Sequence, residues 1–218
     1  MTGNDDARPS TRWGDRTQRR LDILDAARSC IEGDGYLSLN MRDLAADAGV
    51  SPATLYSYFH NKEELFATLY AEAIRAHTQR YQAVVDREPP LMDLLAQLLG
   101  LYIQLYESYG RHFTMWSAMR RDPDEESSPS KVSRDLVREL RAATIENNRL
   151  LISSIRAAAE REGRRMADDR LVPSLLWSYL TGIADHVTTE RGSLDPFPAA
   201  ELVAFAAERL VLTLTDPA

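Results

Sequence analysis

The chain has 218 residues, 44% of them hydrophobic, and no apolar run long enough for a transmembrane helix, so we expect a soluble protein of one or two domains. Its single cysteine, Cys30, excludes an intrachain disulfide and favours a reducing, cytoplasmic location. The net charge of −7 argues against a protein that coats DNA non-specifically.

The chain begins with a polar segment followed by a helical pattern. Residues 1–14 predict a flexible tail. Its Arg8 and Arg12 are of the kind that basic arms place in a minor groove, although a tail without a role is the simpler interpretation. From residue 15 onward, apolar residues recur every three or four positions, which predicts a first helix with Ile23, Leu24, Ala27 and Ile31 on its buried side.

Two short helices joined by a tight turn are predicted next. Asn40 is a candidate N-cap for the first, and Gly49 suits the left-handed conformation that ends a helix. Ser51 would cap the second, and Pro52 would take its first position, where a missing N–H costs nothing. This second helix is expected to run to Phe59. Two such helices about a glycine-centred turn form a helix-turn-helix unit.

The residues of the second short helix divide between two faces. Leu55 and Phe59 lie one turn apart and predict the buried face. The opposite face is narrow, with Ala53 and Ser57, and hydroxyl groups flank it. A helix that enters a major groove needs such a ridge and short hydrogen-bonding groups. An ordinary solvated helix is the alternative, but it leaves the two outward tyrosines unexplained.

Two cations stand where helix dipoles disfavour positive charge. Arg42 is at the second position of one predicted helix, and Lys62 is at the first position of another. A cation there costs about 0.3–1 kcal/mol, so an external anion such as a DNA phosphate would account for both. Residues 1–66 nevertheless contain eight basic and eleven acidic residues, so DNA binding would depend on where the cations are placed rather than on bulk charge.

The run LAADAGVSPATLYSYFHNKEELF resembles the DNA-binding signature of the TetR family of transcriptional regulators. The resemblance covers Leu21 to Phe66, and Ala53 departs from it, because many members have glycine there. It implies a double-stranded DNA operator as partner, read by a helix-turn-helix domain over residues 15–66. The residues expected to contact DNA are Arg42, Ser51, Ala53, Thr54, Tyr56, Ser57, Tyr58 and Lys62.

The rest of the chain has helical patterns and no strand-like alternation, so we expect an all-α fold of about nine helices. Pro89 and Pro90 end the helix that begins at Lys62, and an acidic, serine-rich segment over 121–130 predicts a mobile loop. Asp195 is a candidate cap for the last helix. The remaining helices are expected over 91–109, from 112 onward, and over 131–163, 169–190 and 196–215, in a ligand-binding and dimerisation domain that covers 67–218.

The last two predicted helices are apolar on more than one side. Leu175, Tyr179 and Leu180 belong to a broad apolar face, and Gly182 would let a partner helix approach closely. Two helices from each of two protomers could form a four-helix interface. A larger monomer core is the alternative, and the resemblance to the TetR family favours the homodimer.

Aromatic residues and methionines gather in the middle of the chain, as in a largely apolar site for a small molecule. Asn147 falls inside an apolar stripe, and a buried asparagine needs hydrogen-bond partners that a ligand could supply. A packed core is the competing interpretation of each aromatic residue. The candidate ligand-binding residues are Tyr102, Tyr106, Tyr109, His112, Phe113, Trp116, Met119, Asn147, Leu151 and Trp177.

Signatures of enzymes and metal sites are missing from the sequence. There is no Gly-rich phosphate loop, HExxH, GxSxG or CxxC motif, and the four histidines are not spaced as metal ligands. We therefore expect no catalytic activity, no metal site and no cofactor.

These patterns predict a homodimeric, ligand-responsive regulator similar to the TetR family, with no membrane association. We expect a repressor that a small, largely apolar molecule releases from a palindromic operator. The alternative is a helical ligand-binding protein that acts through a protein partner without binding DNA. The acidic charge balance of the N-terminal region is the feature that supports it.

Overall fold

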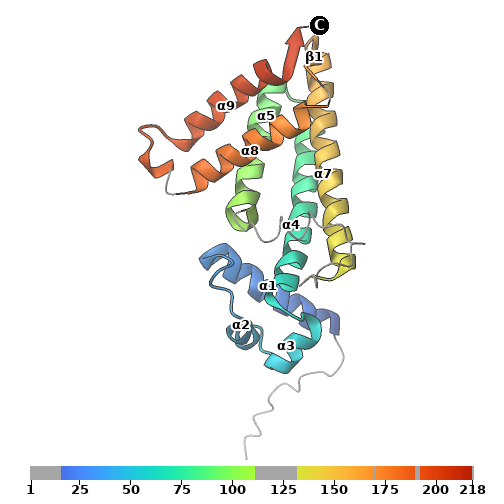
Figure 1. Ribbon diagram of the computed structural model, residues 1–218, viewed down its shortest axis with the longest axis vertical. Helices are drawn as coiled ribbons and strands as arrows, with labels where there is room; N and C mark the ends of the chain where they lie inside the picture. The colour runs from blue at the N-terminus through green and yellow to red at the C-terminus, as the bar shows by residue number, and fades with distance from the viewer. Residues whose placement is uncertain (1–15, 111–131, 169, 190–191, 218) are drawn as a thin grey trace, which may run out of the picture. The chain divides into compact units, whose positions relative to one another are not determined.

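A computed structural model describes residues 16–110, 132–168, 170–189 and 192–217, which form eight α-helices and a small two-stranded sheet (Figure 1). The chain divides between Lys62 and Glu63 into two compact units. Within the described residues, no helix combines the length and apolarity needed to cross a bilayer. Outside them lie the predicted tail over 1–14, the loop over 121–130, and the candidate ligand residues His112, Phe113, Trp116 and Met119.

The described part of the first unit consists of three helices, α1 (Arg16–Asp34), α2 (Met41–Asp47) and α3 (Pro52–Tyr58). The apolar stripe predicted for α1 is buried, with Ile23, Leu24 and Ala27 fully inaccessible. α2 packs against both α1 and α3, so the two short helices share one small core with the long one.

The predicted caps and turn of the first unit are confirmed. Asn40 Oδ1 accepts a hydrogen bond from the Arg42 N–H at 2.8 Å, and Ser51 Oγ accepts one from the Thr54 N–H at 3.1 Å. Gly49 has a φ of 65°, the left-handed conformation that ends α2. The helix-turn-helix is therefore specified by residues next to each helix end.

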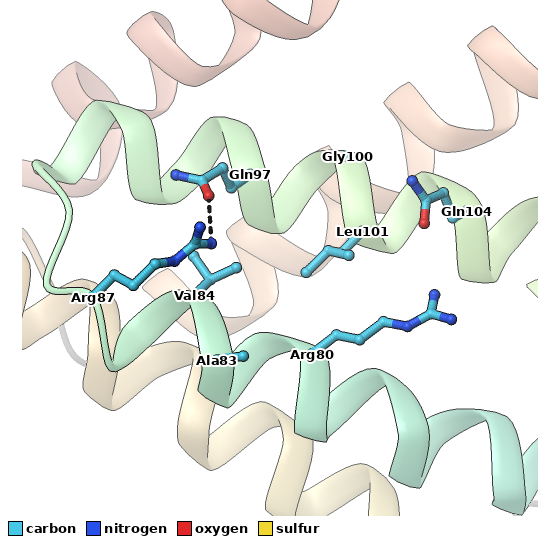
Figure 2. Close-up of a pocket in the computed structure, with 8 residues that line it drawn as sticks. All are labelled: Arg80, Ala83, Val84, Arg87, Gln97, Gly100, Leu101 and Gln104. Atoms are coloured by element: carbon cyan, nitrogen blue, oxygen red, sulfur yellow. Dashed lines mark hydrogen bonds between the residues drawn. The ribbon is translucent and has the colours of Figure 1, made fainter.

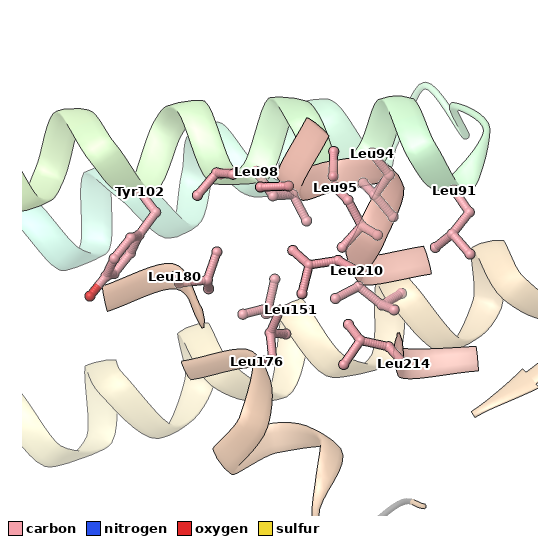
Figure 3. Close-up of a cluster of buried hydrophobic side chains, with 14 of the residues drawn as sticks. Leu91, Leu94, Leu95, Leu98, Tyr102, Leu151, Leu176, Leu180, Leu210 and Leu214 are labelled. Atoms are coloured by element: carbon pink, nitrogen blue, oxygen red, sulfur yellow. The ribbon is translucent and has the colours of Figure 1, made fainter. Parts of the chain in front are cut away.

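The second unit packs long helices around one apolar core (Figure 3). α4 (Lys62–Val85) starts at the last residue of the first unit, and α5 (Leu91–Leu105), α7 (Arg134–Arg161), α8 (Val172–Thr188) and α9 (Ala199–Leu214) follow. Tyr81 of α4 is buried, and its hydroxyl donates to the Leu98 carbonyl at 3.2 Å, so the phenol keeps a hydrogen bond. Leucines dominate the core, among them Leu91, Leu94, Leu95, Leu98, Leu151, Leu176, Leu180, Leu210 and Leu214.

α7, α8 and α9 are each a few residues shorter than the sequence predicted, and two helix ends differ in kind. α5 stops at Leu105, and a π-helical turn, η1 (Tyr106–Gly110), replaces its predicted last turn and buries both Tyr106 and Tyr109. Asp195 does not cap the last helix, because α9 begins after Pro198, and the residue before a proline is disfavoured in helical conformation. Asp195 follows a 3-10 turn, η2 (Gly192–Leu194), and its Oδ2 lies 2.6 Å from His186 Nε2.

The small sheet was not predicted. β1 (Arg164–Met166) pairs antiparallel with β2 (Thr215–Pro217), which joins the segment after α7 to the end of α9. Arg164 donates from Nε to Thr215 Oγ1 at 2.6 Å and from Nη2 to the Thr215 carbonyl at 3.0 Å. Three-residue strands are too short to give an alternating sequence pattern, and this pairing depends on contacts between distant residues.

Candidate DNA-binding surface and ligand cavity

One face of α3 is buried in the first unit, and the opposite face is exposed to solvent. Leu55 and Phe59 are buried, as its sequence predicts, and Ala53, Tyr56 and Ser57 are exposed. The exposed side chains are small along the middle of the helix, so its outer face forms a narrow ridge. Such a ridge fits the width of a major groove.

The hydroxyl groups of α3 are held in place by short hydrogen bonds. Ser51 Oγ lies 2.8 Å from Thr54 Oγ1, and Ser57 Oγ donates to the Thr54 carbonyl at 2.6 Å. The guanidinium of Arg16 lies 5.7 Å from the centre of the half-buried Tyr58 ring, which brings a cation from the start of α1 beside the end of α3. The sequence did not indicate this contact, because only the packing of the first unit brings Arg16 to Tyr58.

The two cations predicted at helix starts are in different surroundings. Arg42 is exposed at the start of α2. Lys62 Nζ donates to the Leu37 carbonyl at 3.3 Å and lies 4.3 Å from the centre of the Tyr36 ring. In the free protein Lys62 therefore holds the loop between α1 and α2, and a DNA phosphate would have to compete with these contacts.

The second unit contains a small cavity of about 20 Å³ among α4, α5, α7 and α8, here termed the internal cavity, which is partly open to solvent beside the exposed Asn148. This is room for about one water molecule, so a larger ligand could enter only if the walls moved apart. Its lining consists of Tyr70, Ile74, Tyr102, Leu105, Thr144, Asn147, Asn148 and Trp177.

The cavity brings together three of the predicted ligand residues, Tyr102, Asn147 and Trp177. Tyr106, Tyr109 and Leu151 are buried outside its lining. Sequence reasoning missed the five other lining residues. Of these five, only Leu105 belongs to an apolar stripe that the sequence predicted, and Asn148 is exposed. Which positions border a cavity depends on how four helices meet.

Polar groups at the cavity are already engaged with neighbours. Asn147 Nδ2 donates to Thr78 Oγ1 at 3.0 Å, and the Tyr102 hydroxyl lies 3.2 Å from Thr181 Oγ1. Burial raises the pKa of Tyr102 to about 12, while its hydrogen bond with Thr181 acts in the opposite direction. Its phenol is therefore neutral at physiological pH and can donate a hydrogen bond.

One buried nitrogen in this unit has no partner. His77 of α4 is 4% exposed, and its Nε2 makes no hydrogen bond to any other residue that the structure describes. Its ring centre lies 4.2 Å from that of Tyr81. Burial and, to a smaller extent, the nearby Arg80 together lower the pKa of His77 to about 4, so the imidazole is neutral at physiological pH.

Comparison with known proteins identifies the family. The family model for bacterial regulatory proteins of the tetR family matches residues 23–69. The HTH-type transcriptional repressor Rv1474c of Mycobacterium tuberculosis is 30% identical over 168 residues, which cover 77% of this chain and 79% of that protein. The chain belongs to the tetR family of bacterial regulatory proteins. It is a DNA-binding transcriptional regulator, as the helix-turn-helix signature predicted.

One further sequence match and one solved structure are similar to this TetR-family regulator. The Fatty acid metabolism regulator protein of Bacillus subtilis is 28% identical over 85 residues, which cover 39% of this chain and 44% of that protein. The solved structure of the transcriptional regulator FadR from Bacillus subtilis, in complex with stearoyl-CoA, matches with a TM-score of 0.59 at 21% identity. It covers 88% of this chain and 97% of that one, and confirms the all-α fold with an N-terminal helix-turn-helix.

Proposed function

We propose that this TetR-family regulator is a cytoplasmic, homodimeric repressor that reads a palindromic operator with α3 and is released by a small, largely apolar molecule. The observation that carries the proposal is the narrow exposed ridge of α3 within a capped helix-turn-helix. The similar protein Rv1474c is named a transcriptional repressor, which supports repression rather than activation.

The exposed residues of the first unit fall into two groups, one placed to contact base edges and one placed to contact phosphates. Ala53 and Ser57, in the middle of the ridge, would face base edges and select the sequence. The residues around the ridge would bind phosphates and position the helix in the groove. This second group comprises Arg42, Ser51, Thr54, Tyr56, Tyr58 and Lys62.

An exposed apolar stripe on the last two long helices supports the dimer. Leu171, the residue before α8, and Leu175 and Tyr179 of α8 recur every four residues and are 64%, 38% and 38% exposed. α9 packs against α8 (Figure 1). Its Phe205 is 58% exposed. No atom lies within 4 Å of the position that a Cβ at Gly182 would occupy, so a second protomer's helix has room there. A monomer rarely leaves such a stripe in water.

The test of the dimer must use exposed residues of this stripe. Leu180 and Leu210 belong to the same predicted helices, but both are buried in the core, so charging them would unfold the protomer. We expect Tyr179→Arg with Phe205→Arg to give a folded monomer in sedimentation experiments. Ile145→Arg, on the exposed face of α7, is the matched control and should sediment like the wild type. A wild type that is monomeric at micromolar concentration would exclude the dimer.

The internal cavity is the proposed site of the releasing ligand. Aromatic and aliphatic side chains form most of its lining, and Asn147 and Thr144 add polar groups, which is the usual make-up of a small-molecule site. The FadR structure was solved with stearoyl-CoA, a molecule with a long apolar chain. By analogy we propose a ligand with a substantial apolar part, whose entry would separate the cavity walls.

Two experiments test the function as a whole. Mobility-shift titration should show that the protein binds specifically to the DNA upstream of its own gene. No specific binding would favour the alternative, a helical ligand-binding protein that acts through a protein partner. Mass spectrometry of a denatured sample would identify a co-purifying ligand, which should then release the DNA. Asn147→Leu should weaken this response, whereas Thr78→Val removes only its hydrogen-bond partner and should preserve most of it. Equal responses in the wild type and Asn147→Leu would place the ligand elsewhere.

A further inference from the structure

A groove on the surface of the second unit runs between the last turns of α4 and the facing part of α5 (Figure 2). Its volume is about 540 Å³, which lies within the range of small-molecule sites, roughly 300–1,000 Å³. The groove shares no lining residue with the internal cavity. It is therefore a separate candidate site.

The groove is basic in a chain whose net charge is −7. Arg80 and Arg87 line it, and no carboxylate does. Neither arginine forms an ion pair with any residue that the structure describes, whereas Arg75 on the same helix pairs with Glu139. The lining thus offers two guanidinium groups whose charge is not neutralised within the protein.

The two arginines stand opposite two glutamines. Arg87 Nη2 donates to Gln97 Oε1 at 2.9 Å, which orients the guanidinium without using up its charge. Arg80 and Gln104 line the other end of the groove (Figure 2). Gln97 and Gln104 lie seven positions apart along α5, so the two ends of the groove are about 10 Å apart. Arg80 lies on α4, and Arg87 lies in the turn that follows it.

The floor between these ends is apolar and open. Leu101 and Val84 contribute aliphatic surface, and Gly100 lies in the middle of α5. Glycine inside a helix costs about 1 kcal/mol relative to alanine. Apart from the nearby backbone of α5 itself, no atom of the described residues lies within 4 Å of the position that a Cβ at Gly100 would occupy, so packing against other elements does not explain this glycine. Its effect is to deepen the groove.

We propose that this groove binds an elongated organic dianion, with one carboxylate or phosphate group at each arginine and an aliphatic stretch over Gly100 and Leu101. Each guanidinium can hold an anionic group through two parallel hydrogen bonds. The Gln104 amide adds a donor at the Arg80 end, whereas Gln97 Nε2 already donates to the Asp93 carbonyl at 3.2 Å and its amide serves to orient Arg87. The apolar floor covers the chain between the two ends. This site goes beyond the proposed function, because it takes a charged ligand outside the internal cavity.

Calorimetric titration of the full chain with three acids tests the required ligand shape. Sebacate has two carboxylates and a chain of suitable length, adipate is too short to reach both ends, and decanoate has only one carboxylate. Sebacate can contact both arginines, whereas adipate and decanoate can each contact only one. We therefore expect sebacate to bind about tenfold more tightly than either of the other two acids. Equal binding of the three acids, or tighter binding of decanoate, would overturn the proposal.

Substitutions locate the binding in the groove. Arg80→Gln and Arg87→Gln should each weaken sebacate binding roughly threefold to fivefold, a range that allows for solvent screening. Arg149→Gln is the matched control, because this α7 arginine is exposed and does not line the groove. The proposal fails if the control weakens binding as much as Arg80→Gln does.

Gly100→Leu separates a binding role from a structural one. The new side chain has space, and leucine favours a helix more than glycine does, so the variant should melt at the same temperature or higher. It would also fill the groove floor and should abolish sebacate binding. A Gly100→Leu protein that binds sebacate like the wild type would contradict the proposed site, whatever its melting temperature.

Discussion

The helices of the two units begin in different ways. In the first unit, α2 and α3 have only seven residues each, and each start is capped by the side chain immediately before it, Asn40 or Ser51. In the second unit, Ser133 caps α7 in the same way, but the N-cap residues of α5, α8 and α9 provide no side-chain hydrogen bond. The first N–H of α5 instead donates at 2.6 Å to Glu162 Oε1, which is 71 positions away in the sequence.

This difference follows from helix length. Helices shorter than about 12 residues are marginal in water, so the short helices of the reading unit depend on local caps. The longer helices of the second unit each bury an apolar stripe and derive their stability from one another. Local changes should therefore affect the first unit mildly, and losses of buried volume should affect the second unit strongly.

The largest expected effect is the loss of a core leucine from the second unit. Leu210 of α9 is completely buried, so Leu210→Ala leaves a cavity and should lower the free energy of unfolding by about 2–5 kcal/mol. Met92→Ala on α5, where the side chain is 51% exposed, is the control and should change it by less than about 0.5 kcal/mol. Denaturant titration measures both. A small effect at Leu210 would show that buried contacts do not dominate this unit.

The next effect concerns the buried histidine of the second unit. Burial lowers the pKa of His77 from 6.5 to about 4, so between these pH values the unfolded chain binds a proton that the folded chain does not. The contribution of neutral His77 to stability is complete above pH 6.5. As the pH falls from 6.5 towards 4, this contribution is lost, and the free energy of unfolding decreases by about 3 kcal/mol.

The matched variant for this pH effect is His77→Gln, which stays neutral throughout. The difference in unfolding free energy between wild type and variant should move in favour of the variant as the pH falls from about 7.5 to about 4.5. If this difference stayed constant with pH, His77 would not be buried in its neutral form.

The same contrast explains what could be predicted from the sequence. Asn40, Gly49 and Ser51 act on residues within a few positions, so the helix-turn-helix and its exposed ridge were predicted from local signals. The internal cavity joins Tyr70, Tyr102 and Trp177 from three helices, and no local pattern distinguishes them from other buried aromatic residues. The strand pairing of Arg164 with residue 217 and the contact between Asp195 and His186 were missed for the same reason.

A smaller effect is expected when a cap of the first unit is removed. Ser51→Ala leaves the Thr54 N–H without its acceptor and should cost about 1 kcal/mol of stability. It should also weaken operator binding, because α3 would fray at its start. Ser57→Ala on the same helix removes only a hydrogen bond to a carbonyl and should melt like the wild type. Equal melting of the two variants would show that α3 does not depend on its cap.

The smallest effect on stability is expected at Lys62, where two contributions oppose each other. Removing a cation from the start of α4 gains about 0.3–1 kcal/mol. Removing its contact with the Tyr36 ring, together with the 3.3 Å hydrogen bond to the Leu37 carbonyl, which water can replace, loses about 0.5–1 kcal/mol. Lys62→Ala should therefore melt close to the wild type. Lys62→Ala should have a larger effect on DNA binding. If each protomer loses one phosphate contact, the slope of log K for operator binding against log salt concentration should flatten by about 1.8 in a dimer.

A second substitution separates the two roles of Lys62. Tyr36→Leu removes the aromatic partner but leaves the charge, so it should keep the salt slope of the wild type and lower stability slightly. Salt titration of operator affinity, paired with thermal melts of the free variants, measures both quantities. An unchanged slope in Lys62→Ala, together with a lower melting temperature, would mean that Lys62 only holds the loop before α2 in place. The local contacts of the first unit would then serve its fold alone, and the phosphates would have to be bound by Arg42 and the hydroxyl groups around α3.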